Sequence, residues 1–214
     1  MLIVVDGIDG SGKETQIRLL ARFLRSRGKK VAMHKYPTAQ ARSLHEHLNN
    51  QRNVGARALF MLFAADIMVE QEKVEKELKQ GKAVLLDRYV TSTLAYQGEK
   101  LPLEQGSRIV EVSGFLKPDL IILLDLPPKL SAQRKMRQKK LDRFESDTAF
   151  LSRVRQRYLK LMRRKFLTSR WKKIDASRGI KAISKEIDSV ISRRLRSPCP
   201  SDRSRSSLIL APIV

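Results

Sequence analysis

The stretch that decides the fold reads Gly7-Ile8-Asp9-Gly10-Ser11-Gly12-Lys13-Glu14-Thr15. The apolar run 2–5 precedes it and the amphipathic stretch 13–27 follows it, which is the order of strand, loop and helix that a phosphate-binding loop needs. Its three glycines allow backbone conformations in which successive N–H groups point at phosphate oxygens, and the positive end of the helix points to the same place. Lys13 adds a full charge where the β- and γ-phosphates of a nucleotide bind. The alternative, a glycine-rich turn with a chance lysine, is disfavoured by the complete spacing.

The position after Lys13 holds Glu14, where such loops have serine or threonine. The missing hydroxyl normally binds Mg²⁺. A carboxylate is also a hard oxygen ligand, so Glu14 is a candidate magnesium ligand, although its charge repels a triphosphate unless the metal or Lys13 compensates. Thr15 points elsewhere on the helix and is a poor substitute for the hydroxyl.

The composition favours a single domain with anionic partners. The chain has 214 residues, and 44 Lys+Arg against 22 Asp+Glu give it a formal charge of +22. A nucleotide, a nucleic acid or a thermophile's charged surface would each fit this charge, although thermophile surfaces are usually rich in Glu as well. The single cysteine, Cys199, excludes an intramolecular disulfide and agrees with a reducing compartment. With no apolar run near the ~20 residues of a membrane span and no leader pattern, we expect a cytoplasmic protein without a membrane partner.

Short apolar runs alternate with longer stretches of helical periodicity, which predicts βαβ units and a parallel sheet. The expected strands are 2–5, 31–34, 83–86, 120–124 and 171–174. The expected helices are 13–27, 40–50, 56–80, 91–97, 103–115, 129–138, 148–167 and 180–195. The predicted fold class is therefore α/β: a P-loop NTPase with a five-stranded parallel sheet flanked by helices on both faces, and with a mobile lid. Ligands bind such sheets at the carboxyl ends of the strands, so the segments 6–12, 36–37 and 87–88, together with Asp125, should face one crevice.

A second cluster follows the third expected strand. Asp87 at its end can hold Mg²⁺ directly or through water, and Arg88 offers a planar fork for a phosphate. A surface ion pair is the alternative interpretation of these two residues. Tyr96 and Gln97 end the short polar helix that comes next, where they would form an aromatic wall with an amide beside it.

Residues 129–170 carry fifteen Lys/Arg and only three acids. A flexible basic segment at about 134–147 can close over a triphosphate as a lid and stabilise the charge of a transferring phosphoryl group. An ordinary solvated helix face is the alternative. From residue 193 the composition shifts to Arg, Ser and Pro, which divides the chain into a domain of residues 1–192 and a tail of residues 193–214. The tail is predicted to be a disordered terminus or, alternatively, a partner-binding arm.

These pieces, in this order, resemble the thymidylate kinase family of P-loop enzymes, which transfer the γ-phosphoryl group of ATP to dTMP. The resemblance covers roughly residues 1–192 and rests on the shared order and spacing of short motifs. Beyond Asp9 in the loop, these motifs are Tyr36-Pro37, Leu62-Phe63-Ala64-Ala65-Asp66, Asp87-Arg88-Tyr89, Ala95-Tyr96-Gln97-Gly98, Lys117-Pro118-Asp119-Leu120, Leu141-Asp142-Arg143-Phe144-Glu145 and Ile174-Asp175-Ala176.

The resemblance implies two nucleotide sites, bound Mg²⁺ and a homodimer. The residues that it implies for ATP are Gly7, Asp9, Gly10, Ser11, Gly12, Lys13, Glu14, Thr15 and, against adenine, Arg134. Those that it implies for the deoxynucleoside monophosphate are Asp9, Tyr36, Pro37, Phe63, Arg88, Tyr96, Gln97 and Phe144. In that set Phe63 stacks on thymine and Tyr96 disfavours a 2′-hydroxyl. The implied catalytic residues are Lys13, Asp87, Arg88, Arg137 and Arg143, and the implied metal ligands are Asp87 and Glu14.

Two further positions depart from the family pattern. Ile67 stands where an arginine usually reads the thymine carbonyl, and Thr38-Ala39 stands where an arginine often binds the substrate phosphate; Arg42 is a candidate replacement. Losing one polar contact to the base costs about 1–3 kcal/mol of discrimination. A shifted base preference, such as dUMP, and a weakly active nucleotide-binding homologue are therefore kept as alternatives. A nucleic-acid-binding protein is the least favoured hypothesis, because the nucleotide sites already use much of the basic excess.

Overall fold

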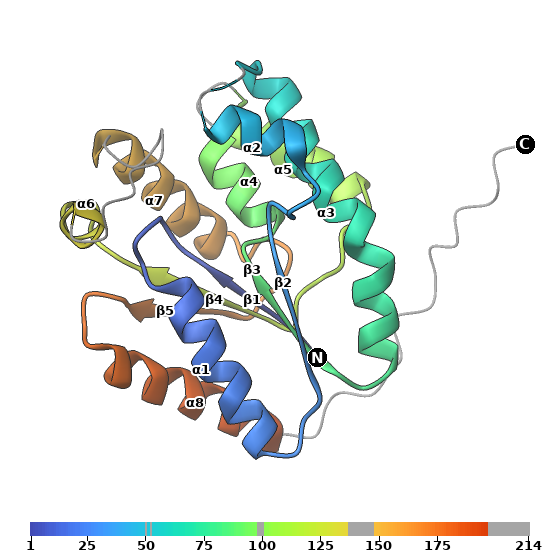
Figure 1. Cartoon of the computed structure of the whole chain (residues 1–214), viewed down its shortest axis with the longest axis vertical. Helices are drawn as coiled ribbons and strands as arrows, with labels where there is room; N and C mark the ends of the chain where they lie inside the picture. Colours follow the sequence, from blue (N-terminus) through green and yellow to red (C-terminus); the bar gives the residue numbers. More distant parts are fainter. Residues whose placement is uncertain (50, 52, 98–100, 137–147, 197–214) are drawn as a thin grey trace, which may run out of the picture.

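The computed structural model describes residues 1–49, 51, 53–97, 101–136 and 148–196. These residues contain one five-stranded sheet in which all neighbouring strands are parallel (Figure 1). The strands are β1 (Leu2–Asp6), β2 (Val31–Lys35), β3 (Ala83–Asp87), β4 (Leu120–Asp125) and β5 (Trp171–Asp175), and their order in the sheet is β2-β3-β1-β4-β5. Each strand extends the predicted apolar run by one polar residue at its carboxyl end. The predicted α/β class with a five-stranded parallel sheet is therefore confirmed.

The helices also follow the prediction, with bounds that differ by a few residues. They are α1 (Lys13–Ser26), α2 (Arg42–Leu48), α3 (Ala56–Lys79), α4 (Val90–Gln97), α5 (Leu103–Val112), α6 (Pro128–Met136), α7 (Thr148–Arg163) and α8 (Ile180–Arg196). α7 ends before the predicted residue 167 because Lys165 and Leu167 have φ values of 52° and 61°, which a right-handed helix does not accommodate. Within the described ranges, no helix has the length and apolar content of a membrane span.

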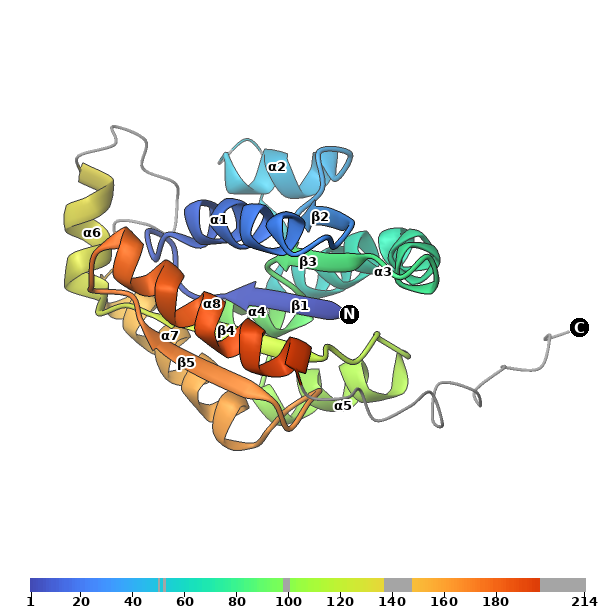
Figure 2. The ribbon, with the colours of Figure 1, turned by 90° about the horizontal axis from the view of Figure 1, so that it is seen from below.

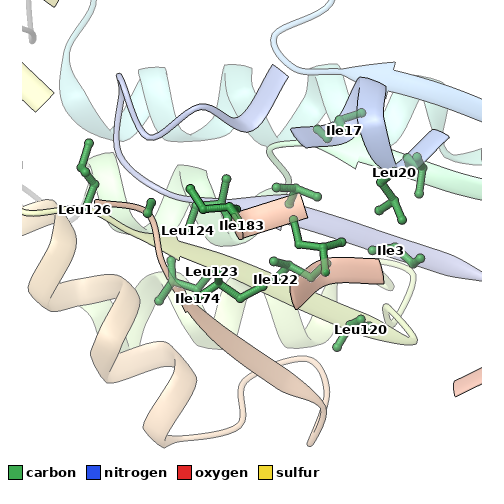
Figure 3. Packing of buried hydrophobic residues seen from close by; sticks show 14 of the residues in the cluster. Ile3, Ile17, Leu20, Leu120, Ile122, Leu123, Leu124, Leu126, Ile174 and Ile183 are labelled. Carbon is green, nitrogen blue, oxygen red and sulfur yellow. The ribbon is translucent and has the colours of Figure 1, made fainter. Parts of the chain in front are cut away.

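The sheet separates two helical layers (Figures 1 and 2). Helices α1 and α8 lie side by side on one face, and α3, α4, α5 and α7 cover the other. Successive strand residues point to opposite faces: in β1, Ile3 and Val5 pack in the cluster that contains α1 and α8, whereas Leu2 and Val4 pack with α3 and α4. Figure 3 shows part of the first cluster. Burial on both faces explains why the strands read as continuous apolar runs.

The strand order decides which loops meet at the carboxyl edge of the sheet. β1 lies between β3 and β4, with Val5 opposite Asp87 and Asp6 opposite Leu123. The chain after β3 stays against β1, because the Arg88 N–H donates to the Val5 carbonyl oxygen at 3.2 Å. The glycine loop that follows β1 therefore lies beside Arg88, the first residue after β3.

Candidate active site

The segment 7–12 forms the turn from β1 into α1, and only glycine fits its first position. Gly7 has a φ of 148°, and a Cβ atom there would lie 2.6 Å from the Leu124 carbonyl oxygen and 2.8 Å from the Ser11 hydroxyl. Gly10 and Gly12 have φ values of 72° and 87°, a region that other residues rarely adopt. No side chain caps α1 at Gly12. The first N–H groups of this helix are therefore suited to hold an anion.

Lys13 is buried against the loop, with 7% of its surface exposed. Its Nζ donates hydrogen bonds to the carbonyl oxygens of Gly7 at 3.1 Å and Ile8 at 3.0 Å. Burial, followed by the charge of Arg88, lowers the pKa of Lys13 to about 8. The ammonium group is thus destabilised in the free protein, and a phosphate beside it would favour its charged form.

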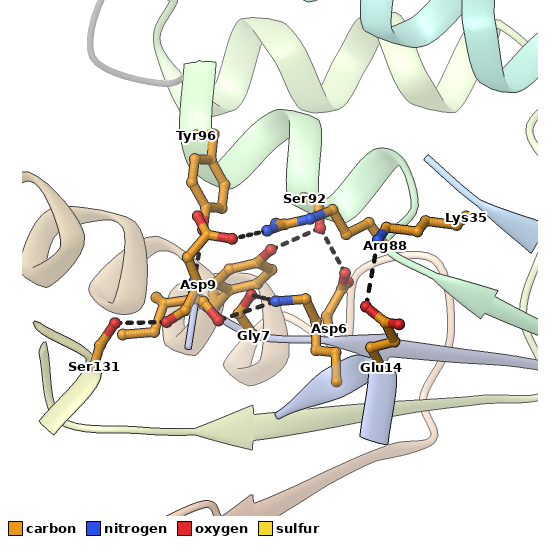
Figure 4. Close-up of polar contacts among 12 residues, drawn as sticks. Asp6, Gly7, Asp9, Glu14, Lys35, Arg88, Ser92, Tyr96 and Ser131 are labelled. Atoms are coloured by element: carbon orange, nitrogen blue, oxygen red, sulfur yellow. Dashed lines mark hydrogen bonds and ion pairs between the residues drawn. The ribbon is translucent and has the colours of Figure 1, made fainter. Parts of the chain in front are cut away.

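Arg88, Asp9 and Tyr96 form a polar cluster above the loop (Figure 4). The guanidinium of Arg88 pairs with the Asp9 carboxylate, and the Tyr96 hydroxyl donates to the other Asp9 oxygen at 2.7 Å. The Tyr96 ring also lies 5.1 Å from the Arg88 Cζ, a cation–π distance. Burial alone would lower the pKa of Arg88, but Asp9 and Tyr96 outweigh burial and raise it well above its usual value. This cluster links the glycine loop, the end of β3 and α4.

Asp87 meets the requirements of a ligand for a hard cation. It ends β3 with 6% of its surface exposed, and its Oδ1 is a buried oxygen without a hydrogen-bond partner. The Ser11 hydroxyl in the neighbouring loop is a second buried oxygen without a partner. Among the described residues no group of three or more His, Cys, Asp or Glu side chains could hold a metal ion by itself. The donors therefore fit an ion that, like Mg²⁺, takes most of its ligands from phosphates and water.

Glu14 has cationic neighbours in this structure. Its carboxylate pairs with Arg18 one turn further along α1, and its Oε2 lies 3.6 Å from the Lys35 Nζ at the end of β2. The Glu14 side chain is 55% exposed. These two cations offset the repulsion between Glu14 and a bound triphosphate. A metal at Glu14 would have to take the carboxylate from one of them.

Several other predicted site residues lie at the same edge of the sheet. Tyr36 is buried directly after β2, where its N–H donates to the Asp87 carbonyl oxygen at 3.1 Å, and a cis peptide bond joins it to Pro37. Gln97 is buried at the end of α4, whereas Phe63 on α3 is partly exposed. Arg134 on α6 donates to the carbonyl oxygen of Ala176, directly after β5, at 2.8 Å.

Three predicted site residues lie outside the part of the chain that the structure describes, whereas both departures from the family pattern lie within it. Arg137, Arg143 and Phe144 lie outside the described residues. Ile67 lies on the buried face of α3, with 2% of its surface exposed. Thr38 binds Asp66 of α3 through its N–H at 2.9 Å and through its hydroxyl. At these two positions the chain thus has an apolar side chain and a threonine bound to a carboxylate in place of cations.

Polar side chains from α4 and α6 support the loop and the residue before it, and no sequence pattern had identified them. Asp6, the last residue of β1, is fully buried and accepts hydrogen bonds from Thr91 and Ser92. Burial raises the pKa of Asp6, although both hydroxyl donors and the nearby cations oppose this. Ser131 of α6 donates to the Asp9 carbonyl oxygen at 2.6 Å. The only sequence signal was an acid at the end of an apolar strand, since nothing in the pattern identifies its distant partners.

Comparison with known proteins finds relatives that share one family description. The family model described as thymidylate kinase matches residues 5–187. A thymidylate kinase of Thermosipho africanus is 35% identical over 205 residues, covering 92% of this chain and 100% of that protein. A thymidylate kinase of Chlorobium luteolum is 34% identical over 215 residues, covering 92% of this chain and 99% of that protein. One from Pseudomonas putida is 32% identical over 200 residues, covering 89% of this chain and 96% of that protein.

The parallel sheet, the phosphate-binding loop and the family match together define a nucleoside-monophosphate kinase, a phosphotransferase of the P-loop class. The family model matches most of the chain, and this match identifies the family within that class. The chain belongs to the thymidylate kinase family.

Proposed function

We propose that this protein phosphorylates dTMP to dTDP with ATP as the phosphoryl donor. The observation that carries the proposal is the ion pair between Arg88 and Asp9, hydrogen-bonded to Tyr96, directly beside the Lys13 loop. It puts a phosphate-binding cation and a hydroxyl-binding carboxylate next to a triphosphate cradle. Phosphoryl transfer depends on such positioned charge more than on an acid or a base.

In this proposal the donor and acceptor use opposite sides of the loop. ATP binds to the backbone N–H groups of residues 7–15 and to Lys13, with adenine against Arg134. The acceptor phosphate takes Arg88 from Asp9, so that Asp9 is released toward the sugar 3′-hydroxyl. The other residues proposed around the acceptor are Tyr36, Pro37, Phe63, Tyr96, Gln97 and Phe144. The segment 134–147 is proposed as the lid, with Arg137 and Arg143 as its cations.

Asp87 is the proposed protein ligand of Mg²⁺, because its buried Oδ1 has no hydrogen-bond partner. When bound, the metal neutralises charge on the β- and γ-phosphates. Glu14 is the second proposed ligand, through the oxygen that otherwise lies near Lys35. If Lys35 competes with the metal for this oxygen, Lys35→Ala should strengthen Mg²⁺ binding, and an unchanged affinity would remove Glu14 from the ligand set.

A homodimer is proposed through the outer face of α3. Met61, Leu62 and Val69 of this helix are large apolar residues with exposed fractions of 51%, 37% and 81%. Exposed apolar side chains grouped on one helix are typical of protein interfaces. Light scattering should give a dimer for the wild type and a monomer for Val69→Glu. A monomeric wild type would contradict the proposal.

The catalytic proposal is tested by a coupled assay with ATP and, in turn, dTMP, dUMP, dGMP and dCMP. We expect the highest kcat/KM for dTMP. Arg88→Gln should lower kcat/KM for dTMP at least a hundredfold while the Kd for ATP stays within a few-fold, because a buried charge-assisted phosphate contact is lost. Arg22→Gln, an exposed change on α1, is the matched control. A folded wild-type protein with no turnover of any of the four would refute the proposed enzyme.

A further inference from the structure

A chain of buried hydroxyl groups connects three elements beneath the site. Ser92 of α4 lies 2.7 Å from the Asp6 Oδ1 at the end of β1 and, through the same Oγ, 2.7 Å from the Tyr158 hydroxyl of α7. Asp6 is 0%, Ser92 6% and Tyr158 1% exposed. Thr91 binds the second oxygen of Asp6. Ser92 is labelled beside Asp6 in Figure 4.

The number of protons that each group can donate fixes the direction of these hydrogen bonds. Thr91 and Ser92 donate to the two carboxyl oxygens of Asp6, so the single hydroxyl proton of Ser92 is used in its bond to Asp6. The Tyr158 hydroxyl must therefore donate to the Ser92 oxygen. Each proton has one destination, and the order Tyr158, Ser92, Asp6 leaves none of the three side chains free to turn. Such a satisfied buried network holds its members in one arrangement.

The two ends of the chain touch opposite halves of the site. Asp6 immediately precedes Gly7, whose carbonyl oxygen accepts from Lys13. The Tyr158 ring packs edge to face against the ring of Tyr96, with centroids 6.5 Å apart and an interplanar angle of 80°. Tyr158 is thus connected to the ATP-binding loop through its hydrogen bond to Ser92, and it contacts Tyr96 of the proposed dTMP site through its ring. Its own helix, α7, begins directly after the segment 137–147.

We propose that Tyr158 and Ser92 are positioning residues that hold the donor loop and the acceptor helix α4 at a fixed mutual distance. This rests on the proposed function, because the two halves are assigned there. Neither hydroxyl needs to contact a nucleotide for this role. In-line transfer is sensitive to such spacing, since a displacement of about 1 Å can cost on the order of a hundredfold in rate.

The test separates the binding of each nucleotide from their mutual placement. The Kd is measured for ATP, for dTMP and for a bisubstrate analogue in which a polyphosphate joins adenosine to thymidine. Tyr158→Phe removes only the hydroxyl and keeps the ring against Tyr96. We expect Tyr158→Phe to weaken the analogue and lower kcat about tenfold, with the separate ATP and dTMP affinities within threefold of wild type.

Two further variants keep the test sharp. Tyr89→Phe is the matched control: Tyr89 is 3% exposed and its hydroxyl donates to the Leu116 carbonyl oxygen at 3.1 Å, outside the chain of three. It should lose a similar amount of thermal stability while kcat and analogue affinity stay unchanged. Ser92→Ala removes the middle link, so Ser92→Ala and the double variant with Tyr158→Phe should be equally impaired.

Each outcome decides the proposal. Equal analogue affinity in Tyr158→Phe and wild type, an equal loss in Tyr89→Phe, or additive losses in the double variant would each overturn the positioning role alone. If the wild type turns over another monophosphate, the analogue carries that nucleoside. A wild type that binds no analogue refutes the proposed function, and the positioning role falls with it.

Discussion

Raising the pH from 7 to 9 should weaken ATP binding about tenfold, because the free protein holds Lys13 with a pKa of about 8. Bound phosphates keep this ammonium protonated, so the affinity follows the protonated fraction of the free protein. That fraction falls from about 0.9 at pH 7 to about 0.09 at pH 9, which corresponds to ~1.4 kcal/mol. The terminal phosphate of ATP is mostly ionised at pH 7 and fully ionised at pH 9, so its own titration changes the affinity much less than the titration of Lys13 does.

Isothermal titration calorimetry measures both consequences. The Kd should rise about tenfold over this interval, and titrations in two buffers of different ionisation enthalpy should reveal uptake of about 0.9 proton per ATP at pH 9. Lys13→Arg is the control, since an arginine stays charged at both pH values. Its Kd should be nearly equal at pH 7 and pH 9, whatever its absolute value. An equal Kd at both pH values for the wild type, or an equal slope in Lys13→Arg, would refute this account of Lys13.

Three other changes test the framework of the site. Arg155→Ala should lower the free energy of unfolding in urea by about 1–3 kcal/mol, because Arg155 binds the mostly buried Asp125 carboxylate through Nε at 2.5 Å and Nη2 at 2.9 Å. Arg155→Lys should lower it less, and equal losses for the two variants would contradict the bidentate pair. Gly7→Ala should abolish ATP binding and lower the melting temperature more than the control variant Gly28→Ala does. A Cβ atom at Gly7 would meet a backbone oxygen at 2.6 Å, whereas a Cβ atom at Gly28, which has a φ of 73°, would meet nothing within 4 Å. Asp87→Asn should raise the Mg²⁺ concentration for half-maximal activity at least tenfold, and an unchanged titration curve would exclude Asp87 as a ligand.

Periodicity predicted the elements well because burial on both faces of a parallel sheet leaves long apolar runs. The five strands were each one residue too short in the prediction, since their last residues are polar and therefore fall outside the apolar runs. The end of α7 was predicted four residues too late, because its helical pattern continues past Arg163 although Lys165 and Leu167 have positive φ. Backbone conformation of that kind leaves no mark in hydrophobic periodicity.

The site was readable where its chemistry is local. The glycine loop and Lys13 lie together in the sequence, and Asp87 and Arg88 follow directly on a strand, so their shared edge of the sheet could be expected. The residues from distant parts of the chain that contact these side chains could not be predicted from the sequence. The Glu14 carboxylate illustrates this: Arg18 is a local neighbour four residues further along the predicted helix, whereas Lys35, on another element, became visible only in the fold.

The sequence by itself determined the phosphate cradle, the parallel sheet and the family resemblance, because each depends on residue types at short, regular spacing. Only the tertiary structure decided that Arg88 pairs with Asp9 across 79 residues and that Ser92 joins Asp6 and Tyr158 across 86 and 66. Those pairings depend on strand order and on how α4 and α7 pack against the sheet. A polar side chain in the sequence does not specify its distant partner, because burial creates the need for a partner and packing decides which one is near enough.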